Sequence, residues 1–327
     1  MVRMLSAFLV CFYILACGAC IKPKISIFPD RTDPLEEYTL QGKGDDKILV
    51  VSVSGFISDG PRGLPFAKKP GTVQEIVSQL KKAEKDKKIK AVILKIDSPG
   101  GSVTASDMLY HEITRYKECS GSKIVAMMMA VAASGGYYVA LPADLIMAHP
   151  TTITGSIGVV SLRPNITGLM SKIGFDVEVE RSGKNKDMGS PFRQSTSEER
   201  RMLQDVIEQM AERFLTLAAN HRHLKDETRV QISSGRIFLA DEALSLGLID
   251  GIGYLDDAIR ETSKLSGLPE DVKVVVYRRT EYKDANLYNS TAEIQQLPEI
   301  SLLGSGITES LPPMQGGLYY LWLPGSF

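Results

Sequence analysis

Residues 131–138 read Val-Ala-Ala-Ser-Gly-Gly-Tyr-Tyr and follow an apolar run at 123–129. The run has the length of a buried strand, and residues 137–141 are able to begin a helix that Pro142 closes. A serine at such a strand-to-helix turn stands clear of its neighbours, and the free N–H groups at the start of a helix are able to hold an oxyanion. The stretch therefore predicts a turn at the edge of an α/β sheet, in which Ser134 is either a nucleophile or a helix cap.

Apolar runs and amphipathic helical patterns alternate along the chain, which is typical of a sheet that is parallel at its centre. Two helices are expected to begin at capping boxes, one formed by Thr72 with Glu75 and one by Ser195 with Glu198. We therefore predict the α/β class, a mostly parallel sheet with flanking helices. The expected strands are at 47–57, 91–96, 123–129, 143–148, 176–180 and, as the last, 272–277.

Two turns that contain glycine are expected to meet at one edge of this sheet. The strand at 91–96 leads into Asp-Ser-Pro-Gly-Gly at 97–101, and the strand at 123–129 leads to Ser134 and Gly135. Because the carboxyl ends of parallel strands share an edge, the N–H groups of Gly101 and Gly135 are placed to face one oxygen atom. The alternative for the glycine pair at 100–101 is that it serves the turn alone.

The composition excludes several classes of protein. The chain of 327 residues has a net charge of −1, and it shows no basic stripe with interleaved aromatic residues of the kind that binds nucleic acid. Three of the four cysteines lie in the first 20 residues, and no cysteine–histidine cluster has the spacing of metal ligands. We therefore expect no nucleic-acid partner, no metal and no other cofactor.

The first 20 residues have the pattern of an export signal. Arg3 precedes an almost wholly apolar stretch that ends at Ala16 and is short for a membrane span of about 20 residues. Cys17 and Cys20 each end an imperfect lipobox, so we expect lipidation at Cys20 or Cys17, with a plain signal peptide or an uncleaved anchor as alternatives. The rest divides into a polar spacer at 21–46, a main domain at 47–280 and a C-terminal extension at 281–327.

Four short motifs follow one another between residues 97 and 191. They are Asp97-Ser98-Pro99-Gly100-Gly101, Ala133-Ser134-Gly135-Gly136-Tyr137-Tyr138, Thr154-Gly155-Ser156-Ile157-Gly158-Val159 and Ser182-Gly183-x-x-Lys186-Asp187-x-x-Ser190-Pro191. Together they resemble the bacterial signal peptide peptidase A family in its short form, over roughly residues 45–280. The resemblance implies a Clp/crotonase-like fold and a membrane-associated serine peptidase whose catalytic domain is 47–280.

The resemblance also implies roles for individual residues. Ser134 would be the nucleophile and Lys186 the general base, with Ser156 orienting Lys186 and the N–H groups of Gly101 and Gly135 forming an oxyanion hole. It further implies a homo-oligomeric ring, in whose short members the lysine can come from the adjacent subunit. The expected substrates are apolar peptides such as remnants of cleaved signal peptides, and the expected location is the extracytoplasmic side of the bacterial cell membrane.

The chemistry of the pair depends on the surroundings of the base. A serine hydroxyl is a poor nucleophile until a base accepts its proton, and a lysine serves as that base only when its pKa falls towards neutrality. Lys184 would favour such a fall as a like charge, whereas Asp187 would oppose it if it turned inward. Without the resemblance, a lysine in a polar loop is a solvated charge.

His149 is the competing base, because a histidine near the end of the next strand, oriented by an acid such as Asp176, would form a triad with Ser134. Two other functions stay open from the residues: an acyl-CoA enzyme of the crotonase superfamily, which uses the same oxyanion hole, and a non-catalytic scaffold of the same fold.

An apolar tail at 318–323 follows a Pro/Gly-rich stretch at 312–317. The tail is interpreted either as a final strand or plug in the core or a subunit interface, or as an extended segment that resembles a substrate and occludes an apolar groove.

Overall fold

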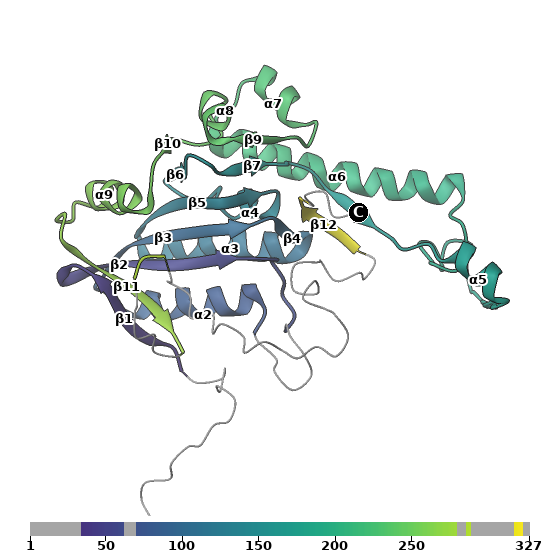
Figure 1. Cartoon of the computed structure of the whole chain (residues 1–327), viewed down its shortest axis with the longest axis horizontal. Helices are drawn as coiled ribbons and strands as arrows, with labels where there is room; N and C mark the ends of the chain where they lie inside the picture. Colours follow the sequence, from purple (N-terminus) through teal and green to yellow (C-terminus); the bar gives the residue numbers. More distant parts are fainter. Residues whose placement is uncertain (1–33, 62–69, 280–285, 289–316, 323–327) are drawn as a thin grey trace, which may run out of the picture.

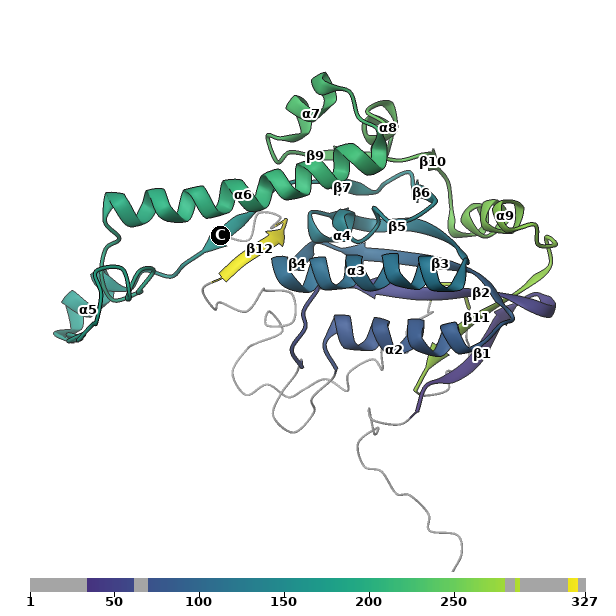
Figure 2. The same ribbon diagram turned by 180° about the vertical axis from the view of Figure 1, so that it is seen from behind.

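The computed structural model describes residues 34–61, 70–279, 286–288 and 317–322, which Figures 1 and 2 show from two opposite sides. The larger of two sheets has nine strands in the order β1-β11-β2-β3-β5-β6-β10, with β7 beside β5 and β9 beside β7. Its strands are β1 (Glu36–Gln41), β2 (Lys43–Ser54), β3 (Ile89–Ser98), β5 (Lys123–Ala133), β6 (Leu145–Ala148), β7 (Ile153–Gly155), β9 (Ile237–Leu239), β10 (Gly251–Ile252) and β11 (Val272–Arg278).

Every pairing from β11 to β10 is parallel, and so is that of β5 with β7, whereas β1 and β9 join antiparallel. This confirms the predicted α/β class with a mostly parallel sheet. A smaller sheet has the order β4-β12-β8, from β4 (Gly100–Ser102), β12 (Gly317–Leu321) and β8 (Val160–Leu162). The helices are α2 (Thr72–Lys85), α3 (Val103–Ser120), α4 (Gly135–Tyr138), α5 (Thr167–Ile173), α6 (Ser197–Arg222), α7 (Asp226–Ile232), α8 (Ala240–Ser245) and α9 (Leu255–Ser266).

The central strand β3 is buried on both faces, which explains its near-continuous apolar sequence. Successive side chains of a strand point to opposite faces, so Val92 and Leu94 pack in the cluster that includes α2 and α3, while Ala91 and Ile93 pack in the cluster that includes α9. Figures 1 and 2 show α2 and α3 on one face of the sheet and α9 on the other. The core is therefore two apolar layers with the sheet between them.

One part of the chain stands away from this core. After β8, residues 163–201 form α5, a polar loop and the first turns of α6, and we call this segment the arm. Both views show α5 and the adjoining end of α6 projecting from the sheet, while the rest of α6 runs back over β12 towards β7 and β9. The single helix α6 thus connects the arm to the carboxyl edge of the sheet.

The expected spacer at 21–46 is wrong in its second half, because residues 36–41 form β1 and β2 begins at Lys43. The residues before 34 lie outside the described part. β1 pairs with the edge of β11, and its Glu37 accepts a 2.7 Å hydrogen bond from Lys47, which also binds Asp86 at 2.9 Å. The polar sequence gave no indication of β1, because an edge strand needs few apolar side chains.

Three local expectations also differ from the structure. Residues 176–180 form no strand, since in the described chain no neighbouring strand pairs with them. Thr72 does not cap α2: its hydroxyl donates to the Phe56 carbonyl at 2.9 Å, and Gly71 precedes the helix. The capping box of α6 lies one residue later than expected, at Thr196 and Glu199. Tertiary contacts, rather than local sequence, set each of these positions.

A chain that begins at residue 47 should be less stable than one that begins at residue 34. It lacks β1, which leaves the edge of β11 unpaired and removes Glu37 as an ion-pair partner of the buried Lys47. We expect the Tm to fall by about 5 °C or more, which corresponds to roughly 2 kcal/mol in a domain of this size. Glu37→Gln in the longer chain removes the ion pair but keeps β1, and so measures the contribution of the ion pair to the Tm separately from that of the strand. Equal Tm values for the two chain lengths would show that β1 is dispensable.

Candidate active site

Ser134 lies in a strained turn between β5 and α4. Its φ is 51° and its ψ is −116°, a conformation that a residue with a Cβ rarely adopts. The Ser134 N–H donates to the Gly155 carbonyl at 2.7 Å, and the side chain makes no capping hydrogen bond to α4. The helix-cap interpretation is therefore wrong. A serine held in a strained strand-to-helix turn is the arrangement known as a nucleophile elbow.

The two glycine turns do meet beside Ser134. A Cβ built on Gly135 would lie 2.5 Å from Ser106 Oγ and 3.1 Å from the Gly101 nitrogen, so the site has room only for glycine. The parallel register of β3 with β5, which aligns Ser98 with Ala132, brings the two turns to the same edge. The backbone nitrogen of Gly101 thus lies close to Gly135, as an oxyanion hole requires.

Ser156 lies next to Ser134. The register of β7 with β5 aligns Gly155 with Ala133, and the next residue on each strand is a serine with positive φ, 51° for Ser134 and 50° for Ser156. The Ser156 N–H donates to the Arg236 carbonyl at 2.8 Å. Both hydroxyl-bearing residues therefore leave their strands at the same level of the sheet.

The tail strand β12 covers this site. It lies antiparallel between β4 and β8, with Tyr320 opposite Gly101 and Leu321 opposite Gly100, and the Trp322 N–H donates to the Pro99 carbonyl at 2.9 Å. Ser134 is accordingly only 1% exposed. A final strand was one of the two interpretations of the tail, but the sequence did not predict that this strand would lie along the glycine turn.

Lys186 lies elsewhere, in the polar loop of the arm. Its loop is tied to the first turns of α6, because Lys184 pairs with Glu198 and Asn185 donates to Met202 Sδ. Near Ser134, α6 contributes Phe214, whose ring lies against Tyr138. Twelve residues of helix, about 18 Å, separate Met202 from Phe214, and a lysine's four-carbon stem does not bridge that distance. One chain does not bring Lys186 and Ser134 together.

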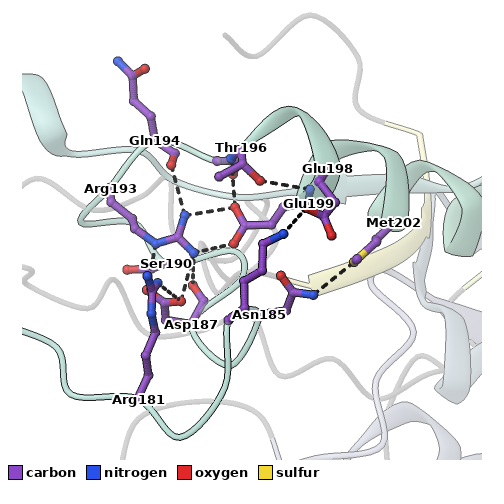
Figure 3. A network of polar contacts seen from close by, with 12 residues as sticks. Arg181, Asn185, Asp187, Ser190, Arg193, Gln194, Thr196, Glu198, Glu199 and Met202 are labelled. Carbon is purple, nitrogen blue, oxygen red and sulfur yellow. Dashed lines mark hydrogen bonds and ion pairs between the residues drawn. The ribbon is translucent and has the colours of Figure 1, made fainter.

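The loop that carries Lys186 is held by a network of charges (Figure 3). Arg193 donates to Asp187 at 2.7 and 2.9 Å and to both carboxylate oxygens of Glu199, one of them at 2.9 Å. Arg181 donates to the same Asp187 carboxylate at 2.7 and 2.8 Å, and Glu199 accepts from the Thr196 N–H at 2.8 Å. Such forked pairs fix geometry as well as charge.

The same contacts shift the pKa values of both acids. Hydrogen bonds from Arg193 and then Arg181 hold the pKa of Asp187 well below its usual range. Glu199, only 2% exposed, has its pKa lowered to about 2 by Arg193 and by the Thr196 N–H. Asp187 is therefore an ionised carboxylate whose negative charge is balanced by two arginines. The sequence analysis did not identify Arg193 or Glu199. Thr196 and Glu199 have the residue types and the spacing of a capping box, and this pattern was the available signal for Glu199.

His149 has other partners. Its backbone N–H donates to the carbonyl of Met128, a residue of β5 that lies six positions before Ser134 in the sequence. The ring Nδ1 of His149 lies 2.9 Å from Thr151 Oγ1. The His149 ring packs edge-on against Tyr254 at 5.0 Å. Asp176, the acid expected to orient it, lies exposed on the arm. The structure therefore gives no support to a triad through His149.

The described residues show neither a metal cluster nor a membrane-spanning helix. They contain no group of three or more His, Cys, Asp or Glu side chains placed to hold a metal ion, and no helix there is long and apolar enough to cross a bilayer. Cys17 and Cys20, the expected lipidation sites, lie outside the described residues.

Comparison with known proteins connects the site to a family. The profile of peptidase family S49 matches residues 117–269, and that of Clp protease matches residues 67–155. A signal peptide peptidase SppA of Enterococcus faecium is 33% identical over 273 residues, 83% of this chain and 79% of the relative. A protease of Synechocystis sp. is 34% identical over 81% of this chain and 90% of its own length. The chloroplastic serine protease SPPA of Arabidopsis thaliana is 34% identical over 78% of this chain, which spans 39% of that relative.

The charge network predicts how the loop that carries Lys186 responds to pH and to mutation. Because both acids have lowered pKa values, their contribution is complete above the unfolded values near 4 and is lost as pH falls towards about 2. Amide exchange over residues 181–199, corrected for intrinsic rates, should stay slow at pH 5 and become fast near pH 2.5.

Arg193→Met should make the same residues exchange rapidly already at pH 7, since it leaves the buried Glu199 without its forked partner. Arg201→Met, which removes an exposed arginine from the first turns of α6, serves as the matched control. Equal protection in both variants would show that the network does not hold the loop.

Proposed function

The chain belongs to peptidase family S49, the serine proteases of the signal peptide peptidase SppA type, and from this premise we propose that Ser134 attacks the peptide carbonyl while Lys186 of a second copy accepts its proton. The observation that carries the proposal is the strained Ser134 turn beside the nitrogens of Gly101 and Gly135. The family also favours a peptidase over the acyl-CoA alternative.

In the proposed reaction each residue of the site has a separate role. As the base takes the hydroxyl proton, Ser134 Oγ bonds to the carbonyl carbon, and the N–H groups of Gly101 and Gly135 stabilise the negative charge on the carbonyl oxygen. The C–N bond then breaks, the amine leaves with the proton from the base, and water hydrolyses the acyl-serine ester. We assign to Ser156, which follows β7 as Ser134 follows β5, the role of orienting the amine of Lys186; the pairing of Gly155 with Ala133 supports this assignment.

The distance between Lys186 and Ser134 within one chain is the reason for invoking a second copy. The arm that carries Lys186 also exposes large apolar side chains, which mark contact surfaces when they gather. These side chains are 41–66% exposed: Leu169, Ile173, Phe175, Val179 and Phe192. A ring in which the arm of one copy lies across the next would cover them and deliver Lys186 to the neighbouring Ser134.

The substrate and the location follow from the same proposal. A peptide that adds as a strand beside β4 must be extended and largely apolar, which fits remnants of cleaved signal peptides. We propose that the domain acts on the extracytoplasmic side of the bacterial membrane, held by a signal anchor or by a lipid on Cys20 or Cys17. A mass spectrum of the native protein identifies the anchor.

Ser134→Ala should lower kcat for peptide hydrolysis by on the order of 10³-fold or more, because no other side chain replaces the attacking oxygen. Labelling by a fluorophosphonate probe should disappear with it. His149→Ala is the control and should keep most activity. Turnover of Ser134→Ala within about tenfold of the natural chain, or an inactive His149→Ala, would contradict the mechanism.

Lys186→Ala should be nearly as inactive as Ser134→Ala, and mixing the two variants should restore activity. Hybrid oligomers then pair an intact serine with an intact lysine from another copy, giving turnover about tenfold or more above either variant alone. In the natural chain activity should rise with pH, since only a neutral amine accepts a proton.

The control for mixing is Ser134→Ala combined with the double variant Ser134→Ala/Lys186→Ala, which offers no intact serine. If mixed oligomers form without recovery of activity, both residues act within one subunit and the shared site is wrong.

A further inference from the structure

Ser98 is the last residue of β3 and lies against both glycine turns of the site. It is 0% exposed. A Cβ built on Gly136 would lie 2.4 Å from the Ser98 carbonyl oxygen, so the start of α4 packs directly on this residue. After Pro99 the chain enters β4, whose Gly101 nitrogen would lie 3.1 Å from a Cβ built on Gly135. Ser98 therefore connects the two backbone donors of the proposed oxyanion hole.

The Ser98 hydroxyl ties the glycine turn to the residue that follows β2. Its Oγ donates to the Gly55 carbonyl at 2.6 Å and accepts from the Gly100 N–H at 3.1 Å. The Gly100 carbonyl oxygen lies 3.4 Å from the same Oγ, but a hydroxyl has one proton to donate and the shorter bond to Gly55 uses it. Because backbone groups engage both the donor and an acceptor of this hydroxyl, Ser98 acts on the backbone of the site and is neither a nucleophile nor a base.

The peptide group between Gly100 and Gly101 is held from its other side. The Gly100 carbonyl accepts a hydrogen bond from the Ile57 N–H at 2.9 Å, and Ile57 pairs with Gly101 in a parallel bridge. No peptide bond in the described part of the chain is cis, and in a trans peptide the C=O and the N–H point in opposite directions. Since the carbonyl points to Ile57, the Gly101 N–H points to the opposite edge of β4, beside which the proposed substrate strand adds.

The orientation of this N–H depends on hydrogen bonds, because glycine itself restricts it little. Gly100 has a φ of 105°, and a pair of glycines lacks the side chains that limit rotation of the peptide group between them. The bond from Ile57 fixes one of the two peptide planes that meet at Gly100, and the bond to Ser98 fixes the other. Without the Ser98 hydroxyl, the buried Gly100 N–H loses this partner at a cost in free energy. The plane that it belongs to is then no longer held, and its rotation moves the Gly101 N–H out of line.

Resting on the oxyanion hole of the proposed function, we propose that Ser98 is a positioning residue for the reaction. Its hydroxyl holds Gly100 between the end of β2 and the start of β4, so that the Gly101 N–H faces the carbonyl oxygen of the group that Ser134 attacks. Its backbone contact with Gly136 keeps the second donor at a fixed distance from the first. The negative charge on that oxygen develops only as the reaction proceeds, so loss of the Ser98 hydroxyl slows the chemical step and leaves peptide binding in place.

The first test is Ser98→Ala in the full chain, which removes the hydroxyl and keeps the backbone contact with Gly136. We expect kcat for peptide hydrolysis to fall by about 10- to 100-fold, because a misaligned donor costs less than the roughly 10²- to 10³-fold loss of a whole donor. KM should change by less than about twofold, since binding of the uncharged substrate does not need the oxyanion hole. An unchanged kcat, or a loss that appears in KM alone, would overturn the proposal.

Ser122→Ala is the matched control for this variant. Ser122 precedes β5 and is also buried, and its hydroxyl also donates to a backbone carbonyl, that of Ile89 at 3.4 Å. Both residues lie at the starts of their strands, at the opposite edge of the sheet from Ser134. Ser122→Ala should therefore keep the natural kcat, and an equal loss of kcat in both variants would assign the effect of Ser98→Ala to general loss of structure.

Two inhibitors built on one peptide sequence distinguish positioning from support of the fold. A peptide aldehyde adds to the serine, and the oxygen of the adduct occupies the oxyanion hole, whereas a peptide with CH2–NH in place of the scissile amide has no carbonyl to stabilise. Ser98→Ala should raise the Ki of the aldehyde by about tenfold or more and that of the reduced peptide by less than about twofold. Neither Ki depends on the fraction of folded protein. Equal increases in the two Ki values would overturn the proposal.

Ser98→Cys replaces Ser98→Ala in both measurements if the alanine variant does not fold, because a thiol keeps the side chain but is a weak hydrogen-bonding group. The direction of both effects should be the same. Ser134→Ala separates the two levels of inference. If Ser134→Ala still hydrolyses peptides, the proposed function fails, whereas Ser134-dependent hydrolysis that Ser98 variants leave unchanged defeats the role of Ser98 alone.

Discussion

The close approach of backbone to backbone at the carboxyl edge of the sheet is the constraint on which this structure depends. The chain reverses at Ser134 with positive φ, and Gly135 fits so tightly against Gly101 and Ser106 that no Cβ has room. Parallel strands make this possible because β3 and β5 end at the same edge and in a fixed register. The free-energy cost of the strained serine is offset by the two apolar layers that pack on either face of the sheet.

Helix α6 connects the two ends of the proposed chemistry. Its first turns anchor the loop of Lys186 through Glu198 and Glu199, and its middle contacts Tyr320 of β12 through Phe214 and the Met210 carbonyl. One helix therefore holds both the tail strand beside Ser134 and the loop whose Lys186 we assign as the base of a neighbouring copy. Under that mechanism, the assembly of copies sets the relative position of serine and lysine.

The charged residues next to Lys186 in sequence pair with one another. Arg181 and Arg193 engage the carboxylate of Asp187 from two sides, and Arg193 also engages the buried Glu199. An acid next to a lysine in sequence would hold that lysine in its charged form, which a general base must leave. Here the acid is already paired, so sequence proximity alone misjudges its effect.

The sequence by itself determined the α/β class, the parallel central sheet, the turn at Ser134 and the meeting of Gly101 with Gly135, because hydrophobic periodicity and glycine positions act locally and parallel strands end at one edge. It did not reveal β1, since a polar edge strand is recognised only by its partner β11, and it misplaced the cap of α6 and the strand at 176–180. Only the tertiary structure decided that the tail enters as β12 with Tyr320 stacked on Tyr138, and that much of α6 separates the loop of Lys186 from the residues around Ser134 in the same chain. Both depend on contacts between segments far apart in sequence, and no local pattern encodes such distances.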